Sequence, residues 1–322
     1  MFPKQRLRRL RRSENIRKMV QETHLSLDDL VYPVFVGEGL SEPQVIESMP
    51  GIRRIPPQMV HDEMQEIRAD GISAVMLFGI PKVKDGLGSA AYDQDGVVQN
   101  AIRETRRSTP DMVIMADVCM CQYTDTGHCG IYKKGAVDND ITIQYLGEIA
   151  TSYAKAGVDV VSPSAMMDGQ VAAIREHLDK GGYTNVAIMA HSAKHHSSLY
   201  APFRDAADCA PKQGDRSEYQ VSYANPRQAM MEVALDIEEG VDIVMIKPAM
   251  TYLDLVAESR RRFDIPIAAY SVSGEYALVH AAHAQGMIDK NAVMLEVLGS
   301  IKRAGADIII TYFAREVSGL LR

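Results

Sequence analysis

Eight short, strongly apolar segments recur along this 322-residue chain, and stretches with the periodicity of amphipathic helices lie between them. The segments are rich in β-branched residues and mostly lack the polar alternation of a sheet with one wet face. Such runs are typical of parallel strands that are covered on both faces. A chain that repeats strand and helix eight times is predicted to form an α/β fold of the (β/α)8, or TIM, barrel type. The segments are 31–36, 72–78, 112–118, 158–163, 185–191, 241–248, 265–270 and 306–313.

A doubly wound sheet is the main alternative for this order of elements. Its dinucleotide-binding form carries a Gly-x-Gly-x-x-Gly turn after the first strand, and this chain has no such turn there. Three junctions also repeat as sequence: AGVDVVS from 156, EGVDIVM from 239 and AGADIII from 304. Each has a Gly suited to end a helix and an Asp before a buried strand. The pattern favours one barrel domain over residues 31–322.

Residues 1–30 precede the first strand and are predicted to form an extended N-terminal arm. Six of the residues between positions 6 and 17 are Arg, and few apolar residues are present to form a core. Two interpretations are open at this point: a frayed terminus, or an arm that makes inter-subunit contacts by lying on a neighbouring copy.

The overall charge and hydropathy exclude several classes of partner. The formal net charge is −7, so no general attraction to nucleic acid or to an anionic membrane is expected. No run of about 18 apolar residues suggests a membrane span, and the basic N-terminus lacks the apolar core of a secretory signal. Acidic Glu14 argues against a transit peptide. We therefore expect a cytoplasmic protein that binds neither nucleic acid nor membranes.

Three of the four cysteines, Cys119, Cys121 and Cys129, fall within eleven residues, which indicates a metal site before a disulfide scaffold. Thiolates favour zinc, and three protein ligands leave a fourth position for water or substrate, as in a catalytic site. His128 could instead supply the fourth ligand of a structural site. Cys209 lies far along the chain and is expected to be an ordinary loop cysteine.

Two lysines are predicted to meet at the barrel mouth, because the chemistry of this fold lies at the carboxyl ends of the strands. Lys247 ends the sixth strand within the apolar run VMIKPAM, and Lys194 follows the fifth strand. Burial and a second ammonium both lower the pKa of a lysine, so one amine can become a nucleophile for a ketone near neutral pH. Either lysine alone would also fit a salt-bridged structural residue. Other polar residues at or near strand ends are Asp117, Ser273 and Tyr312.

More than about thirty residues separate the fifth strand from the next helix near Asn225, and loops of this length are usually functional lids. We refer to residues 195–220 as the lid. Arg204 and Arg216 in the lid could clamp a carboxylate, and Gln220 could add a donor. Three histidines near Lys194 lack a fourth ligand at suitable spacing and are expected to be hydrogen-bonding residues of the lid: His191, His195 and His196.

Four motifs resemble the signatures of the porphobilinogen synthase family, also called 5-aminolevulinate dehydratases: MADVCMCQYTDTGHCG (115–130), HSAKHHSSLYAPFRDA (191–206), VMIKPAMTYLD (244–254) and AAYSVSGEY (268–276). The similarity extends from the arm to TYFARE at 311–316. It implies a lyase that condenses two 5-aminolevulinate molecules into porphobilinogen, with loss of two waters, early in tetrapyrrole (heme) biosynthesis. The three cysteines resemble the zinc-type members of the family.

The resemblance also implies a role for each candidate residue. Lys247 forms the Schiff base with the first substrate and Lys194 serves the second. Zinc acts as a Lewis acid, and Asp117 transfers a proton or orients an amine nearby. The carboxylate of the first substrate is held by Ser273 and Tyr312. The carboxylate of the second substrate is held by Arg204, Arg216 and Gln220. The zinc is held by Cys119, Cys121 and Cys129.

Members of this family form homo-octamers whose arms embrace a neighbour, and many bind an activating, allosteric magnesium outside the active site. Glu232 occupies the matching position, although a solvated helix carboxylate is an equally simple interpretation. The chain departs from the familiar pattern at Ala165 and Gln170, where an acid and a basic residue are usual, and at His191, where Tyr is common.

Two other functions compete with this interpretation. A class I aldolase or lyase would use a strand-end lysine on the same barrel, but it would not need three clustered cysteines. A non-catalytic, zinc-stabilised assembly protein would leave the lysine pair unexplained.

Overall fold

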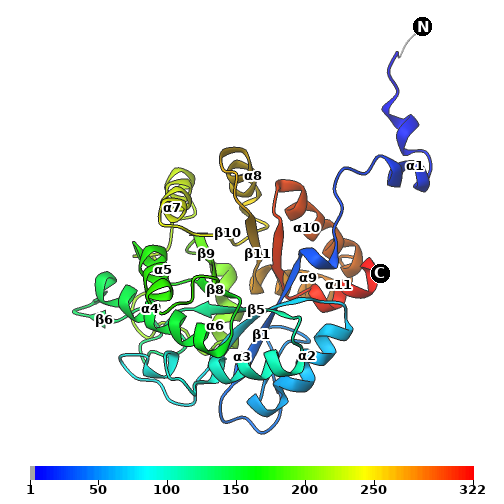
Figure 1. Ribbon diagram of the computed structural model, residues 1–322. Helices are drawn as coiled ribbons and strands as arrows, with labels where there is room; N and C mark the ends of the chain where they lie inside the picture. The colour runs from blue at the N-terminus through cyan, green and yellow to red at the C-terminus, as the bar shows by residue number, and fades with distance from the viewer. Residues whose placement is uncertain (1–3) are drawn as a thin grey trace.

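Eight parallel strands form the centre of the molecule, and helices surround them (Figure 1). The computed structural model describes residues 4–322. The strand order follows the chain, and the last strand pairs with the first to close the barrel, so the TIM-barrel prediction is confirmed. The barrel strands are β1 (Leu30–Gly37), β4 (Ala74–Ile80), β5 (Val113–Val118), β8 (Val160–Pro163), β9 (Ala187–Lys194), β10 (Ile243–Lys247), β11 (Ile267–Ser271) and β12 (Ile308–Thr311).

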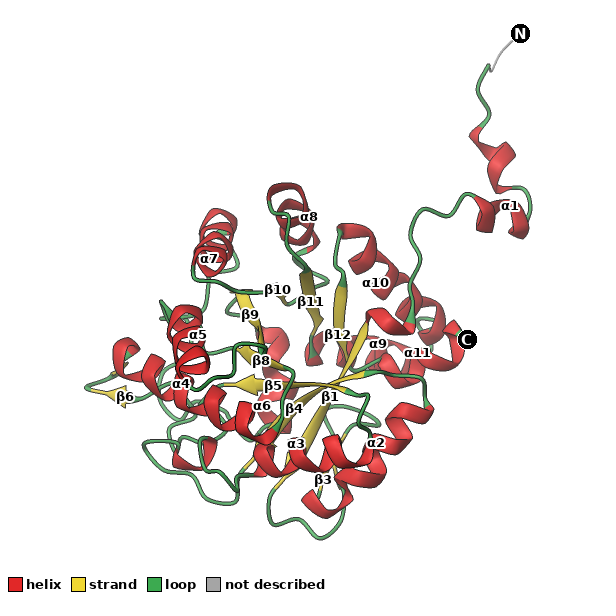
Figure 2. Cartoon of the chain, in the orientation of Figure 1, coloured by secondary structure: helices red, strands yellow, loops and turns green. Residues whose placement is uncertain are grey.

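The helices lie outside the barrel strands, and at least one helix separates each pair of consecutive barrel strands (Figure 2). Helix α4 (Asn139–Ala156) begins after Asp138, whose carboxylate accepts the N–H of Ile141. Gly157 then ends this helix with a left-handed φ of 101°. The other helices around the barrel are α2 (Val60–Ala69), α3 (Val97–Ser108), α5 (Gln170–Lys180), α7 (Pro226–Glu238), α8 (Leu253–Arg262), α9 (Ser273–Ala284), α10 (Lys290–Ala304) and α11 (Ala314–Leu321). The short helix α6 (Ala201–Ala206) belongs to the lid.

The aspartates of the three repeated junctions share one hydrogen-bonding pattern. Each carboxylate accepts the backbone N–H of a residue near the start of the neighbouring barrel strand. The junctions therefore fasten the amino ends of adjacent strands to each other, which explains why the same residue type recurs there. The donor–acceptor pairs are Ile114 with Asp159 at 2.8 Å, Ile188 with Asp242 at 2.7 Å, and Ile267 with Asp307 at 2.8 Å.

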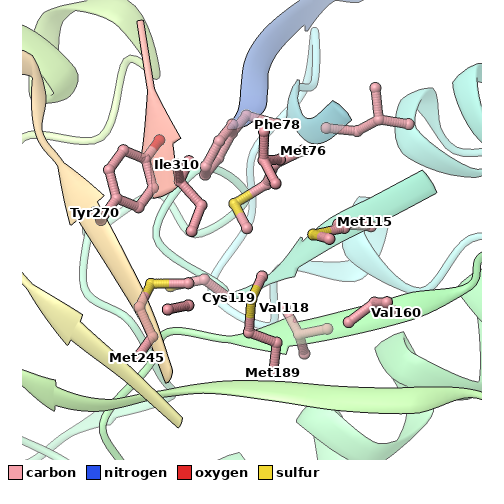
Figure 3. Close-up of a cluster of buried hydrophobic side chains, with 14 of the residues drawn as sticks. Met76, Phe78, Met115, Val118, Cys119, Val160, Met189, Met245, Tyr270 and Ile310 are labelled. Carbon is pink, nitrogen blue, oxygen red and sulfur yellow. The ribbon is translucent and has the colours of Figure 1, made fainter. Parts of the chain in front are cut away.

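The barrel interior is filled by side chains and is not a pore. Met115, Met189 and Met245 meet there with Phe78 and Tyr270, and all five are buried (Figure 3). Methionine is unbranched and fills irregular gaps between larger groups. Reactive groups are therefore confined to the mouth, where the strands end.

The arm extends away from the barrel (Figure 1) and contains a 3-10 turn at Leu7–Arg11 and the short helix α1 (Glu14–Met19). Apolar side chains in the outer part of the arm face solvent: Leu7 is 73% exposed and Met19 is 84% exposed. The first strand begins at Leu30, one residue before the predicted boundary of the barrel domain. Over the described residues, no helix combines the length and the apolar character that a membrane crossing requires.

Candidate active site

The two lysines lie side by side at the mouth. Lys194 is the last residue of β9 and Lys247 the last of β10, and their Cα atoms are direct partners in the parallel ladder. Both side chains are buried. The Nζ of Lys194 donates to the carbonyl of Ser164 at 2.5 Å, and the Nζ of Lys247 lies 3.9 Å from the centre of the Tyr270 ring. The sequence therefore placed this pair correctly.

The environment of Lys247 favours its neutral amine. Burial lowers the pKa of Lys247 to about 7, and the nearby charge of Lys194 acts in the same direction. An ordinary lysine stays protonated far above neutral pH and cannot attack a carbonyl. Lys247 thus combines the burial and the charged neighbour that an amine nucleophile needs.

The three clustered cysteines converge after β5. The sulfur atoms of Cys119, Cys121 and Cys129 all lie within 4.8 Å of one another, and all three residues are buried. Thiol hydrogen bonds from Cys119 and Cys121 lower the pKa of Cys129 well below its usual range. Three convergent sulfur donors, one of which ionises readily, suit a soft metal ion such as zinc.

His128 does not point at this cluster, which contradicts its alternative role as a fourth ligand. Its Nε2 lies 2.9 Å from the carbonyl of Gln213, and its Nδ1 lies 3.1 Å from the hydroxyl of Tyr219. Both ring nitrogens are therefore engaged by the segment 207–220. The fourth position of the cluster is left to a group other than His128.

Cys209 is not the ordinary loop cysteine that its place in the chain suggested. It is 1% exposed, and its thiol hydrogen bonds with that of Cys121, which lowers the pKa of Cys209 to about 6. No local sequence pattern could reveal this, because Cys209 reaches the cluster only through the path of the lid. It is not one of the three thiols that converge within 4.8 Å.

Asp117 lies between the lysines and the cysteine loop. It is buried at the end of β5, and its carboxylate accepts a hydrogen bond from the amide of Gln122 at 3.1 Å. Burial raises the pKa of Asp117, although the charge of Lys194 opposes this effect. The carboxyl therefore holds a proton more readily than an exposed aspartate does.

The lid packs closely on both sides of the mouth. Gly127 has a left-handed φ of 72°, and a Cβ on it would lie 2.4 Å from the carbonyl oxygen of Ala210. A Cβ on Gly274 at the start of α9 would lie 2.5 Å from the carbonyl oxygen of Leu199. Only glycine allows backbone to approach this closely. The lid is thus fitted to the cysteine loop and to α9.

Several lid groups are buried without partners. The Nε of Arg204, the Nε of Arg216 and both amide atoms of Gln220 have no hydrogen-bond partner among residues 4–322. The Nη2 of Arg216 donates to the carbonyls of Gly127 at 3.0 Å and Cys209 at 2.5 Å. Unpaired buried donors of this kind are suited to bind an anionic ligand.

Ser273 and Tyr312, the other two predicted carboxylate binders, already have hydrogen-bond partners within the protein. The Ser273 hydroxyl accepts the N–H of Phe203 at 3.0 Å and donates to the Leu199 carbonyl at 3.3 Å. The hydroxyl of Tyr312 lies 3.2 Å from that of Tyr270. Both residues line the same end of the barrel as Lys247, and a ligand would compete with these contacts.

Comparison with known proteins agrees with this geometry. Residues 4–320 match the family model described as "Delta-aminolevulinic acid dehydratase". The chain belongs to this family. The dehydratase of Archaeoglobus fulgidus is 50% identical over 100% of this chain and 99% of its own, and that of Bacillus subtilis is 46% identical over 97% of both. The crystal structure of the Toxoplasma gondii enzyme in complex with the reaction product porphobilinogen superposes with a TM-score of 0.96, at 40% identity, over 99% of this chain and 92% of that one.

The three histidines near Lys194 do not all belong to the lid of this dehydratase. His195 stacks on Tyr252 with ring centres 3.9 Å apart, and His196 lies 3.9 Å from Asp215. His191, by contrast, is a fully buried residue of β9. Its expected place in the lid is wrong, because β9 continues to Lys194 and not only to 191. The other two departures, Ala165 and Gln170, are both buried beyond β8.

Glu232 lies on α7 beside a polar cavity of about 450 Å³ that Asp168 and Glu218 also line. Burial raises the pKa of Glu232, and the carboxylates of Asp168 and Glu239 act in the same direction. A cation would relieve this repulsion. A proton on Glu232 would relieve the same repulsion.

Proposed function

We propose that this dehydratase condenses two molecules of 5-aminolevulinate into porphobilinogen, with loss of two water molecules. The observation that carries the proposal is the pair of buried lysines in register at the barrel mouth. 5-Aminolevulinate is a ketone that also carries an amine and a carboxylate. A site for two such molecules needs imine-forming amines, carboxylate binders and groups that move protons, and all three kinds are present.

Lys247 forms the first imine. Its amine is substantially neutral near pH 7, so it can add to the ketone carbon of the first substrate. Lys194 binds the second ketone, and its charge adds to the effect of burial in lowering the pKa of Lys247. The Ser164 carbonyl holds the Lys194 amine in place at the mouth.

The carboxylates of the two substrate molecules are held on opposite sides of the barrel mouth. The unpaired atoms of Arg204, Arg216 and Gln220 bind that of the second substrate from the lid. Ser273 and Tyr312 bind that of the first substrate near Lys247. The lid then excludes water while the two molecules are joined.

Cys119, Cys121 and Cys129 hold a zinc ion. When bound, the zinc supplies Lewis acidity toward the second substrate or a departing water. Asp117 stands between this loop and the lysines, and its raised pKa suits it to take up and return a proton during ring formation.

The arm and Glu232 serve the assembly. The exposed apolar side chains of the arm, Leu7 and Met19 among them, are covered by a neighbouring subunit in a homo-octamer. Glu232 takes part in binding an allosteric magnesium ion through its carboxylate. The enzyme acts in the cytoplasm, early in heme biosynthesis.

A colour test for the pyrrole decides the main proposal. The protein is incubated with 5-aminolevulinate and zinc, and a Lys247→Met variant serves as the matched control. We expect product from the wild type and none from the variant. An aldolase would make no pyrrole, and a non-catalytic assembly protein would leave the substrate unchanged, so either result would overturn the proposal.

A further inference from the structure

His191 occupies an irregular point of β9, just before the lysine pair. The pairing of β9 with β10 shifts between Val244 and Ile246, where two steps along β10 match three along β9. The extra residue in β9 forms a β-bulge. In a regular strand, residues three apart face opposite sides, but the bulge lets His191 and Lys194 share the interior face.

The neighbours of His191 support this orientation. Met189, two residues earlier, lies in the barrel interior (Figure 3). Ser192 lies close enough to Asp236 of α7 to lower the pKa of that carboxyl, and so faces the outside of the barrel. His191 is 0% exposed, and neither of its ring nitrogens has a hydrogen-bond partner within residues 4–322.

The charged groups that face His191 come from three elements: Lys194 from its own strand, Lys247 from β10 and Cys129 from the cysteine loop. The Tyr270 ring of β11 lies 6.3 Å from the imidazole, centre to centre. Burial lowers the pKa of His191 well below its usual range, and both lysine charges act in the same direction. The ring is therefore neutral, with one N–H donor and one acceptor nitrogen.

A buried imidazole with two unpaired nitrogens is a poor core residue, because an apolar side chain would fill the same space without losing hydrogen bonds. Its neighbours on the interior face, Met189 and Met245, are apolar. The polar side chain of His191 is therefore better explained by a hydrogen bond to a ligand bound at the barrel mouth than by packing in the core.

We propose that His191 holds the oxygen that leaves the substrate ketone when Lys247 forms its imine. This rests on the proposed function of Lys247. The amine nitrogen bonds to the ketone carbon, one amine proton moves to the oxygen, and a second follows as the C–O bond breaks. Water leaves and the nitrogen lone pair completes the C=N bond. His191 donates a hydrogen bond from its ring N–H to this oxygen and holds it while it becomes water. Both protons come from the Lys247 amine, so no further reactant is needed.

The test compares His191→Phe, which removes both polar atoms, with His191→Gln, which keeps a donor and an acceptor. The rate of borohydride trapping of 5-aminolevulinate at Lys247 is measured against pH. We expect the Phe variant to trap about 10²-fold more slowly and the Gln variant to recover most of the rate. The pH midpoint should not move, because it belongs to Lys247. Zinc content and melting temperature should match the wild type.

Equal trapping by the wild type and the Phe variant would overturn the inference, as would a shifted midpoint with an unchanged plateau. If the Phe variant does not fold, His191→Met serves the same comparison. Failure of the proposed function gives a different result, since the wild type itself would then trap no substrate at Lys247.

Discussion

Replacing Lys194 by Met should slow imine formation at Lys247 and move its pH dependence upward. The pKa of Lys247 is about 7, against an ordinary value of 10.5. At pH 7 about half of the amine is then neutral, compared with roughly 3 in 10,000 for an ordinary lysine, so the environment is worth at most about 10³-fold in rate. Burial is the larger cause and survives the substitution. The variant should therefore lose only part of this factor, and it should regain rate as the pH rises.

The assay is borohydride trapping followed by peptide mapping with mass spectrometry. Lys194→Arg is the matched control, because it keeps the positive charge but cannot form an imine. It should trap substrate at Lys247 with a pH profile close to that of the wild type. An unchanged profile in Lys194→Met would refute the electrostatic argument. An adduct confined to Lys194, or pyrrole production by Lys247→Met, would show that the first imine forms on the other lysine.

Three further outcomes follow from the metal site, the arm and the lid. Chelation should abolish pyrrole formation while circular dichroism stays native, because the three thiols lie on one loop; unfolding on chelation would contradict a catalytic zinc. Deleting residues 1–30 should give smaller oligomers in light scattering, since the apolar residues of the arm would no longer cover a neighbour; an unchanged octamer would refute this. Levulinic acid, which supplies a carboxylate to Arg204 and Arg216, should slow limited proteolysis within residues 207–220; equal cutting with and without it would count against closure of the lid.

The barrel could be predicted from the sequence because each of its strands is a distinct apolar run. The lysine pair followed from the fold, since a closed parallel barrel brings consecutive strand ends together. The clustering of Cys119, Cys121 and Cys129 is local, so their spacing alone indicated a common site. The barrel, the lysine pair and the cysteine cluster all depend on contacts between elements that are adjacent in the chain. The periodicity of the apolar residues identifies such elements directly.

The lid-dependent contacts could not be predicted in the same way. His128 contacts Gln213, which is 85 residues away, and Cys209 reaches Cys121 across a similar separation. The lid has little regular structure, so its sequence carries no periodicity that fixes its path. His191 was misplaced for another reason: β9 continues to Lys194, beyond the predicted end of the strand at 191. The bulge within β9 also changes which residues face inward, and no residue type signals it.

Arg216 joins two functions that a matched pair of substitutions can separate. Its guanidinium is buried, and it ties the cysteine loop to the lid through the carbonyls of Gly127 and Cys209 while its Nε remains unpaired. Lysine keeps the charge but cannot reproduce this planar set of donors. Arg216→Lys should therefore raise KM by about tenfold or more and also weaken zinc binding, because the loop loses its anchor.

Arg204 lies on α6 and is only partly buried, and no hydrogen bond ties its side chain to the cysteine loop in the described part of the chain. Arg204→Lys should raise KM to a similar extent and leave zinc affinity unchanged. Titration of the zinc-depleted variants with a chromophoric chelator as competitor measures affinity without relying on turnover. Equal zinc affinity in both variants would show that the contacts of Arg216 with the two carbonyls do not support the metal site, and that the two arginines differ only in their burial.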